Sequence, residues 1–190
     1  MATQPFPKLT EHDYLALDRA ADFKSEFVDG EMYAMSGGTF RHGGLAVNLV
    51  ISLGTQLRGS HFRVFNSDVR VRTAKKGSYL YPDLSVVCGP IERFEGADDI
   101  LANPVVIGEV LFPSTADHGT KFEIYREIPA LMDHLLVHSD EMFIEHFTRQ
   151  PDGNWLLSDH KGTDAFVELP STGCRITLVE IYEGTEAPLS

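Results

Sequence analysis

Hydrophobic residues repeat at two spacings along the chain, and the wider spacing marks a long helix. In residues 42–59 (HGGLAVNLVISLGTQLRG), Leu45, Leu49 and Leu57 recur at roughly helical intervals, which predicts an amphipathic helix. Gly59 is a natural end for this helix, because glycine readily adopts the left-handed conformation that closes many helices.

Two shorter segments also have helical spacing. Residues 9–20 (LTEHDYLALDRA) predict a short helix with Thr10 as its N-cap, since the threonine hydroxyl can accept a hydrogen bond from a free backbone N–H. Residues 117–128 (DHGTKFEIYREI) return to helical spacing. Pro129 ends that helix, because proline has no backbone N–H to donate.

Strand patterns fill much of the remaining chain. Residues 62–73 (FRVFNSDVRVRT) alternate apolar and charged side chains in their second half. Residues 79–89 (YLYPDLSVVCG) and 104–112 (PVVIGEVLF) are more continuously apolar, which is typical of central strands covered on both faces. Hairpins and paired strands are predicted at residues 25–37, 133–139, 141–149 and 150–157, with Asp-Gly turns at 29–30 and 152–153.

The order of these elements indicates one mixed α/β domain. A helix, three strands, a helix and a strand follow one another, with further hairpins around them. No internal repeat, low-complexity tract or long linker interrupts the chain. We therefore expect residues 1–190 to form a single α/β (α+β) domain, with a mixed central sheet, flanking helices and added β-hairpins.

The charge balance limits the partners of the protein. The chain has 28 acidic residues against 16 lysines and arginines, a formal net charge of −12. Such a surface repels polyanions at long range, which argues against a protein that coats nucleic acid by charge alone. A local cationic groove, or one loaded with metal, is still compatible with this charge.

Neither a membrane span nor a disulfide framework is expected. No apolar run reaches the roughly 18 residues that suggest a membrane helix. The first residues lack the basic and apolar regions of a signal peptide, so we expect a cytoplasmic protein. Cys88 and Cys174 have no CxxC spacing and are predicted to be separate buried thiols.

Two carboxylates stand where apolar residues are expected. Glu109 lies within the apolar segment 104–112, and Asp83 directly follows Pro82 in another apolar segment. A buried ionised carboxylate costs on the order of several kcal/mol unless a cation or strong donors meet it. The two acids are 26 positions apart on neighbouring predicted strands, so the connection through 89–103 could bring them side by side. A divalent cation would relieve their repulsion, and such oxygen ligands suit Mg²⁺ or Mn²⁺.

Lys121 can supply a further positive charge. It lies 12 positions after Glu109, near the first turn of the next helix, where the helix dipole disfavours a lysine. Its position is better explained if it points back at an anionic pocket, with Tyr125 one turn further on the same face. Two acids, a divalent ion and a lysine suit phosphodiester hydrolysis, because the metal activates water and the lysine stabilises developing charge.

Each of these residues also has a simpler structural explanation. Asp83 could be a turn residue after a proline, and Glu109 could pair with Lys121 or with an arginine. Lys121 could be an ordinary surface lysine. The combination of carboxylates inside two apolar strands with a lysine at the next helix start favours a shared site.

At these residues the chain resembles the Uma2 family of restriction-endonuclease-like proteins, within the PD-(D/E)XK nuclease superfamily. The resemblance implies an αβββαβ core and a DNA endonuclease that uses Mg²⁺ or Mn²⁺. It further implies metal ligands at Asp83 and Glu109, the carbonyl of Val110 as a third ligand, and Lys121 as a catalytic lysine that has moved to the following helix. The resemblance is carried by EFVDGEMYAMSG, RHGGLAVNL, FNSDVRVR, YPDLSVVCG, GEVLFPST, GTKFEIYREIPAL and GCRITLVEIYEG.

Three features depart from the pattern of that superfamily. Leu111 occupies the place of the usual lysine, Phe112 stands where relatives tend to have a small polar residue, and the link from Thr115 to Lys121 is slightly short. With the acidic charge, the last two features favour a second hypothesis, a non-catalytic interaction or nucleic-acid-binding module on a degenerate nuclease scaffold. A third hypothesis makes the two carboxylates the acid and nucleophile of a glycosidase, but it leaves Lys121 without a role.

Other polar residues are candidates for the same pocket. His42 starts the long helix, Asn48 lies along it, and Glu31 lies on the preceding hairpin. We expect these side chains, with Tyr125, to line the pocket. The alternatives are a contact at the helix entry for His42 and an exposed turn for Glu31.

Two expectations concern metal and assembly. His134 and His138 have the i, i+4 spacing of a zinc pair on a helix, but they bracket LLV, which predicts a strand and places them too far apart to chelate easily. Hydrolysis of both strands of a duplex requires two sites, so a two-fold homodimer is the simplest assembly.

Overall fold

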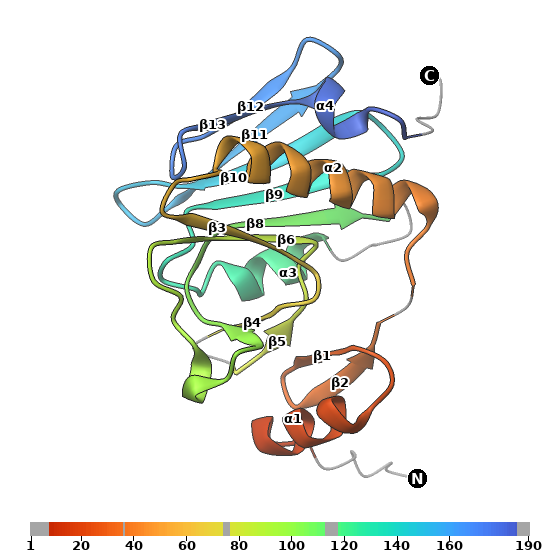
Figure 1. The fold of residues 1–190 in the computed structure, drawn as a ribbon, viewed down its shortest axis with the longest axis vertical. Coiled ribbons are helices and arrows are strands. Elements are labelled where there is room, and N and C mark those ends of the chain that lie inside the picture. Colours follow the sequence, from red (N-terminus) through yellow and green to blue (C-terminus); the bar gives the residue numbers. More distant parts are fainter. Residues whose placement is uncertain (1–7, 36, 74–76, 113–117, 186–190) are drawn as a thin grey trace, which may run out of the picture.

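A six-stranded mixed sheet forms the centre of the molecule (Figure 1). The computed structural model describes residues 8–35, 37–73, 77–112 and 118–185. In this part of the chain the strand order is β11-β10-β9-β8-β6-β3, with β8 and β9 parallel and the other neighbours antiparallel. The strands are β3 (Phe62–Asn66), β6 (Leu84–Cys88), β8 (Pro104–Leu111), β9 (Asp133–His138), β10 (Phe143–Arg149) and β11 (Trp155–Lys161).

Helices cover both faces of this sheet. Helix α2 (Phe40–Gln56) packs Leu45, Leu49 and Leu53 against one face, and all three side chains are fully buried. Helix α3 (His118–Tyr125) packs against the other face through Ile124 and Tyr125. The expectation that the two most apolar strands are covered on both sides is therefore confirmed for β6 and β8.

A smaller five-stranded sheet lies below α3 in Figure 1. Its order is β2-β1-β5-β4-β7, and helix α1 (Glu11–Ala20) packs on it through Tyr14, which stacks on Phe27 with ring centroids 4.8 Å apart. Thr10 caps α1 as predicted, in a reciprocal capping box with Asp13. The strands are β1 (Ser25–Val28), β2 (Glu31–Ala34), β4 (Arg70–Arg72), β5 (Tyr79–Leu80) and β7 (Ile100–Leu101).

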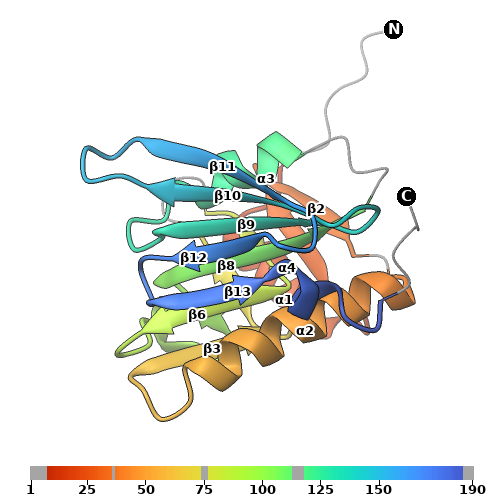
Figure 2. The ribbon, with the colours of Figure 1, turned by 90° about the horizontal axis from the view of Figure 1, so that it is seen from above.

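The last part of the chain closes the core on the α2 side. A two-stranded ribbon and a short helix follow β11 and bury Val167, Ile176 and Ile181 in the same cluster as α2. Figure 2 shows this ribbon lying over the central sheet. These elements are β12 (Phe166–Leu169), β13 (Cys174–Thr177) and α4 (Leu178–Tyr182), and a 3-10 turn, η1 (Phe94–Gly96), precedes β7.

The predicted order of helix, three strands, helix and strand is present as α2, β3, β6, β8, α3 and β9. Two segments with strand patterns each divide between the two sheets: the prediction of one strand is wrong for residues 62–73, whereas an interruption at Pro82 is what proline predicts in residues 79–89. Residues 62–73 form β3 and β4 on either side of a turn, and residues 79–89 form β5 and β6 on either side of Pro82. Proline cannot donate to a sheet ladder, so the strand breaks there.

Three smaller points complete the comparison with the sequence. Helix α2 begins at Phe40 rather than at His42, and its C-cap is Leu57, with Gly59 in the left-handed region just beyond it. Cys174 is buried as expected, but Cys88 is exposed, because it is the last residue of β6 and lies at the end of the strand. Among the described residues, no helix combines the length and the apolar character needed to cross a membrane.

Candidate active site

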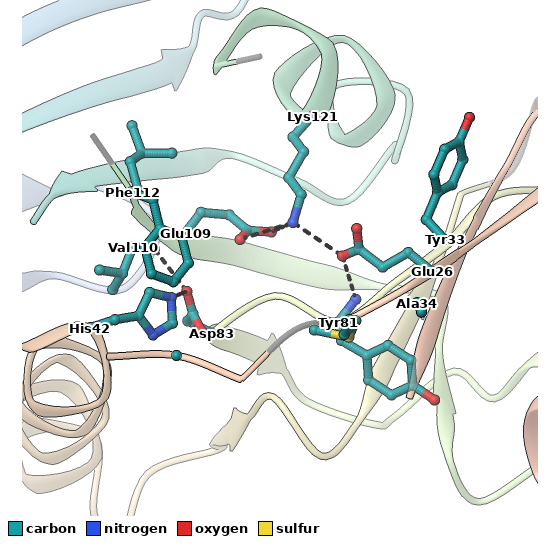
Figure 3. A pocket seen from close by; sticks show the side chains of 13 residues that line it. Glu26, Tyr33, Ala34, His42, Tyr81, Asp83, Glu109, Val110, Phe112 and Lys121 are labelled. Atoms are coloured by element: carbon teal, nitrogen blue, oxygen red, sulfur yellow. Dashed lines mark hydrogen bonds and ion pairs between the residues drawn. The ribbon is translucent and has the colours of Figure 1, made fainter. Parts of the chain in front are cut away.

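A cavity of about 240 Å³ opens where the central sheet, α3 and the β1–β2 hairpin meet (Figure 3). The register of β6 and β8 creates it, because Leu84 lies opposite Gly108 and the next positions outward are Asp83 and Glu109. The polar side chains that line the cavity are Glu26, Tyr33, His42, Tyr81, Asp83, Glu109 and Lys121. We call Glu26, Asp83, Glu109 and Lys121 the carboxylate pocket.

Glu109 is the most deeply placed acid of this pocket. Its side chain projects from β8 towards α3, and the residue is only 5% exposed. The hydroxyl of Tyr125 donates to Glu109 Oε1 at 2.7 Å, and Lys121 Nζ lies 3.3 Å from each carboxylate oxygen. Burial raises the pKa of Glu109 to about 7, against the attraction of Lys121 and with added repulsion from Asp83 and Glu26.

Lys121 lies between two carboxylates (Figure 3). Its Nζ is 3.1 Å from Glu26 Oε1 as well as 3.3 Å from Glu109. Burial opposes the charged form of Lys121, but the two carboxylates outweigh it and raise the pKa of the ammonium group above its ordinary value. The lysine is therefore held as a cation that points into the pocket from the first turn of α3.

Asp83 directly precedes β6, and its carboxylate lies between the backbone of Val110 and the imidazole of His42. The N–H of Val110 donates to Asp83 Oδ2 at 2.8 Å, and His42 Nε2 lies 3.3 Å from the same oxygen. The contact with Asp83 raises the pKa of His42, and burial acts in the opposite direction. The His42 ring stacks on Phe112, with centroids 4.7 Å apart and planes 10° from parallel.

The structure brings together most of the residues that the sequence singled out. Asp83, Glu109, Val110, Lys121 and His42 all line one cavity. Two simpler explanations also hold in part, because Glu109 does pair with Lys121 and Asp83 does accept a backbone hydrogen bond. Tyr125 is fully buried beneath the cavity and contacts it only through Glu109. Residues 113–117, which include Thr115 and most of the link to Lys121, lie outside the described part of the chain.

Two expected pocket residues lie elsewhere. Glu31 is exposed on β2, a strand in which three of the four residues are exposed, and it accepts a hydrogen bond from the Tyr33 hydroxyl at 2.7 Å. Asn48 faces α4 instead, where its amide donates to the carbonyls of Ile181 and Glu183 at 2.9 Å each. These two predictions are corrected accordingly.

The histidines of β9 do not form a metal pair. His134 is fully buried among aromatic rings, and His138 Nε2 contacts Glu145 Oε2 at 2.9 Å. Residues four apart on a strand are separated by about 13 Å, which is too far for two ligands of one ion. The strand prediction for LLV is confirmed.

Glu26 is the pocket residue that the sequence did not reveal. It lies on β1 of the smaller sheet, where it bonds Lys121 and accepts a longer contact of 3.4 Å from the N–H of Tyr81. Its strand reads Ser-Glu-Phe-Val, in which a charged residue alternates with a buried one as in any half-exposed strand. The nearest distinctive feature of the sequence is the Asp29-Gly30 turn, and a turn by itself does not indicate a functional site.

The pocket contains oxygen donors and excess negative charge. Three carboxylates face one lysine, and their mutual repulsion contributes to the raised pKa of Glu109. This donor set fits a hard divalent cation better than a soft one. Among the described residues, no group of three or more His, Cys, Asp or Glu side chains is already arranged around one point as metal ligands. Backbone oxygen and water would therefore have to complete the coordination of an ion.

Comparisons with known proteins identify the family of the chain. The model of the Uma2 family, described as "Putative restriction endonuclease", matches residues 12–178. Two proteins of Synechocystis sp. PCC 6803 are similar over most of their length, and both are described as uncharacterized. The protein slr1290 is 35% identical over 95% of this chain and 94% of its own, and sll1609 is 34% identical over 84% and 92%.

A solved structure shares the fold. The crystal structure of a protein from Anabaena variabilis ATCC 29413, described as "a putative nuclease belonging to DUF820", superposes with a TM-score of 0.75. It covers 92% of this chain and 97% of its own, at 18% sequence identity. The mixed α+β architecture described above is therefore that of a known nuclease-like fold, and the sequence match shows that the chain belongs to the Uma2 family.

Proposed function

We propose that the protein is an endonuclease that hydrolyses phosphodiester bonds of DNA, with Mg²⁺ or Mn²⁺ bound in the carboxylate pocket. One observation carries the proposal. Asp83, Glu109 and Lys121 line a single cavity, in a chain that belongs to the Uma2 family. A phosphodiester is an anion, and the three carboxylates of the pocket would repel it without a bound metal ion.

Asp83, Glu109 and the carbonyl of Val110 are the groups that would hold the ion. When bound, such an ion polarises a phosphoryl oxygen and lowers the pKa of a coordinated water. The excess negative charge of the pocket favours its binding. Among the described residues that line the cavity, Met35 has the one soft donor atom, and the other side-chain donors are mostly oxygens.

The protein's own side chains position and neutralise charge. Lys121 is already directed into the cavity as a cation, so its ammonium group can donate to the oxygens of a bound phosphate and stabilise the charge that develops there. Glu26 holds the lysine from the opposite side, and Tyr125 fixes the carboxylate of Glu109. His42 and Phe112 form the wall next to Asp83 and limit water on that side.

Cleavage of a supercoiled plasmid and of a linear duplex tests this proposal. The purified protein should nick or cut both in the presence of Mg²⁺ or Mn²⁺ and lose this activity with a chelator. The variants Asp83→Asn, Glu109→Gln and Lys121→Met should each reduce the rate by at least about 100-fold, which corresponds to about 2.7 kcal/mol. Glu31→Gln is a matched control, because Glu31 is an acid on a neighbouring strand that does not line the cavity. Equal activity of the three variants and the control would reject the assignment.

A non-catalytic module is the second candidate, and one observation favours it. Asp83 Oδ2 is satisfied within the protein by the Val110 N–H and by His42, so this acid has a structural role without any ion. Calorimetric titration with Mn²⁺ separates the two candidates without an activity assay. Binding that is lost in Asp83→Asn and kept in Glu31→Gln supports the nuclease, and the absence of binding supports the module.

A further inference from the structure

The outer face of helix α2 is apolar and uncharged. Phe40, Val47 and Ile51 are 104%, 56% and 58% exposed, although each is a large hydrophobic side chain. Their spacing of seven and four residues places them on one side of the helix, away from Leu45, Leu49 and Leu53 in the core. From residue 43 to residue 57 the chain has no Asp, Glu, Lys or Arg, although its net charge is −12.

Two glycines on this face have no explanation within the described chain. Glycine inside a helix costs about 1 kcal/mol relative to alanine, so it normally has a packing reason. Gly44 has one, because an added Cβ would lie 3.2 Å from Thr185 Cγ2. A Cβ at Gly43 or Gly54 would meet nothing within 4 Å among the described residues. Close approach of a second backbone from outside would account for both glycines.

A groove runs along the same face. It has a volume of about 450 Å³ and lies between α2 and the turn after β3, which contributes Asn66 and Ser67. Its helical wall consists of His42, Gly43, Ala46, Val47, Val50 and Ile51, so most of this wall is apolar. In Figure 2, α2 lies along the margin of the molecule, next to α4.

Two pairs of residues on this face are arranged symmetrically. Counted outward from the midpoint between Asn48 and Leu49, Gly43 corresponds to Gly54 and Val47 to Val50. Two identical helices that pack antiparallel around a two-fold axis place such equivalent positions opposite each other. Valine then meets valine at the axis, where the helices cross, and glycine meets glycine on either side of the crossing.

We propose that the α2 face is a two-fold dimer interface, in which α2 packs antiparallel on α2 of a second copy of this chain. The absence of charge is what a like-charged copy needs, because any acidic patch would be repelled across the axis. A nucleic acid would find no lysine or arginine on this face, and a large exposed apolar patch is a common sign of a protein interface. This inference is independent of the proposed nuclease activity.

The dimer would have a consequence for the carboxylate pocket. The groove beside α2 is also lined by His42 and Asp83, so it adjoins the cavity that holds Glu109 and Lys121. The helix of the second copy would form an outer wall of this groove. Each pocket would then open beside the two-fold axis rather than on an isolated face.

Sedimentation equilibrium of the full chain tests the interface. The wild type should sediment with twice the 21.1 kDa mass of one chain. Val47→Glu places like charges near the axis and should weaken dimerisation by at least 100-fold. Leu17→Glu is the matched control, because Leu17 is 50% exposed on another helix, and it should remain dimeric.

Two further measurements separate loss of the interface from loss of folding. Gly54→Ala should raise the thermal stability of the monomer, since it removes a helix-interior glycine, and at the same time weaken the dimer. A mixture of Val47→Glu and Val47→Lys should recover a dimer, because opposite charges then meet across the axis. A wild type that is monomeric at every concentration, equal effects of Val47→Glu and Leu17→Glu, or binding of the monomer to phosphatidylcholine vesicles through this face would overturn the proposal.

Discussion

The ammonium nitrogen of Lys121 lies 3.3 Å from both carboxylate oxygens of Glu109, and this contact joins α3 to the middle of the central sheet. It explains how a glutamate remains within a strand whose other residues are almost all buried and apolar. Burial still raises the pKa of Glu109 to about 7, so one lysine, shared with Glu26, compensates the carboxylate only in part.

Removal of Lys121 should therefore destabilise the fold as well as the site. We expect Lys121→Met to lower the free energy of unfolding by about 1–3 kcal/mol, because a buried carboxylate loses its cation but can take up a proton. The double variant Lys121→Met/Glu109→Gln should recover part of this loss, since no buried charge is then left unpaired. Urea denaturation of the two single variants and the double variant measures the coupling. Additive effects of the two substitutions would contradict the pairing.

His134 should make the fold sensitive to acid. The residue is fully buried on β9, its ring is nearly parallel to that of Phe122, and neither ring nitrogen has a hydrogen-bond partner among the described residues. Burial lowers its pKa from 6.5 to about 3, and the positive charges of Lys121 and His146 act in the same direction. The phenol of Tyr125 on α3 also faces this ring.

The sign of the pH dependence follows from these values. Between pH 6.5 and about 3 the unfolded chain binds a proton at His134 that the folded chain does not bind, so stability falls as the pH falls through this window. Relative to His134→Leu, the wild type should lose about 2–3 kcal/mol of unfolding free energy between pH 7 and pH 4.5. Chemical denaturation of both proteins at these two pH values provides the test. Parallel pH profiles would show that His134 has a partner.

The sequence predicted that Asp83, Glu109 and Lys121 lie close together, but it did not predict every residue that lines their cavity, and the reason is physical. Asp83 and Glu109 were detectable because a carboxylate in an apolar strand conflicts with its surroundings. Glu26 was not, because it occupies an alternating strand in which a charged residue is expected on one side. Glu26 joins the pocket only because the smaller sheet packs beside α3, and the local sequence pattern does not predict that packing. Glu31, on the other strand of the same hairpin, was predicted to line the pocket but is exposed outside it.

Asp18 should be a strong stability determinant although it lies outside the pocket. Its buried carboxylate accepts the N–H of Ser25 at 3.0 Å and the Tyr81 hydroxyl at 3.1 Å, and it pairs with Arg70 at 2.9 Å. Asp18→Asn leaves Arg70 with less charge compensation in a buried setting and should cost about 3 kcal/mol. Asp22→Asn, an exposed acid four residues later, should change stability by less than about 0.5 kcal/mol. Thermal denaturation of both variants compares them, and similar melting temperatures would argue against this role.

Gly108 should be necessary for the close packing of α2 on β8. An added Cβ at this position would lie 2.8 Å from Leu49 Cδ2 and 3.3 Å from Leu84 Cβ, in a region where both neighbours are fully buried. Gly108→Ala should therefore destabilise the protein by about 1–3 kcal/mol, as expected for overpacking of a dense core. Because Leu49 is the nearest neighbour, Leu49→Val should remove the contact, and the double variant should be more stable than Gly108→Ala alone if the clash is the cause. To relieve the clash in Gly108→Ala, α2 would have to shift, and this shift would move His42 away from Asp83. The proposed Mn²⁺ binding, measured by calorimetry, should then change in Gly108→Ala and return towards the wild-type value in the double variant.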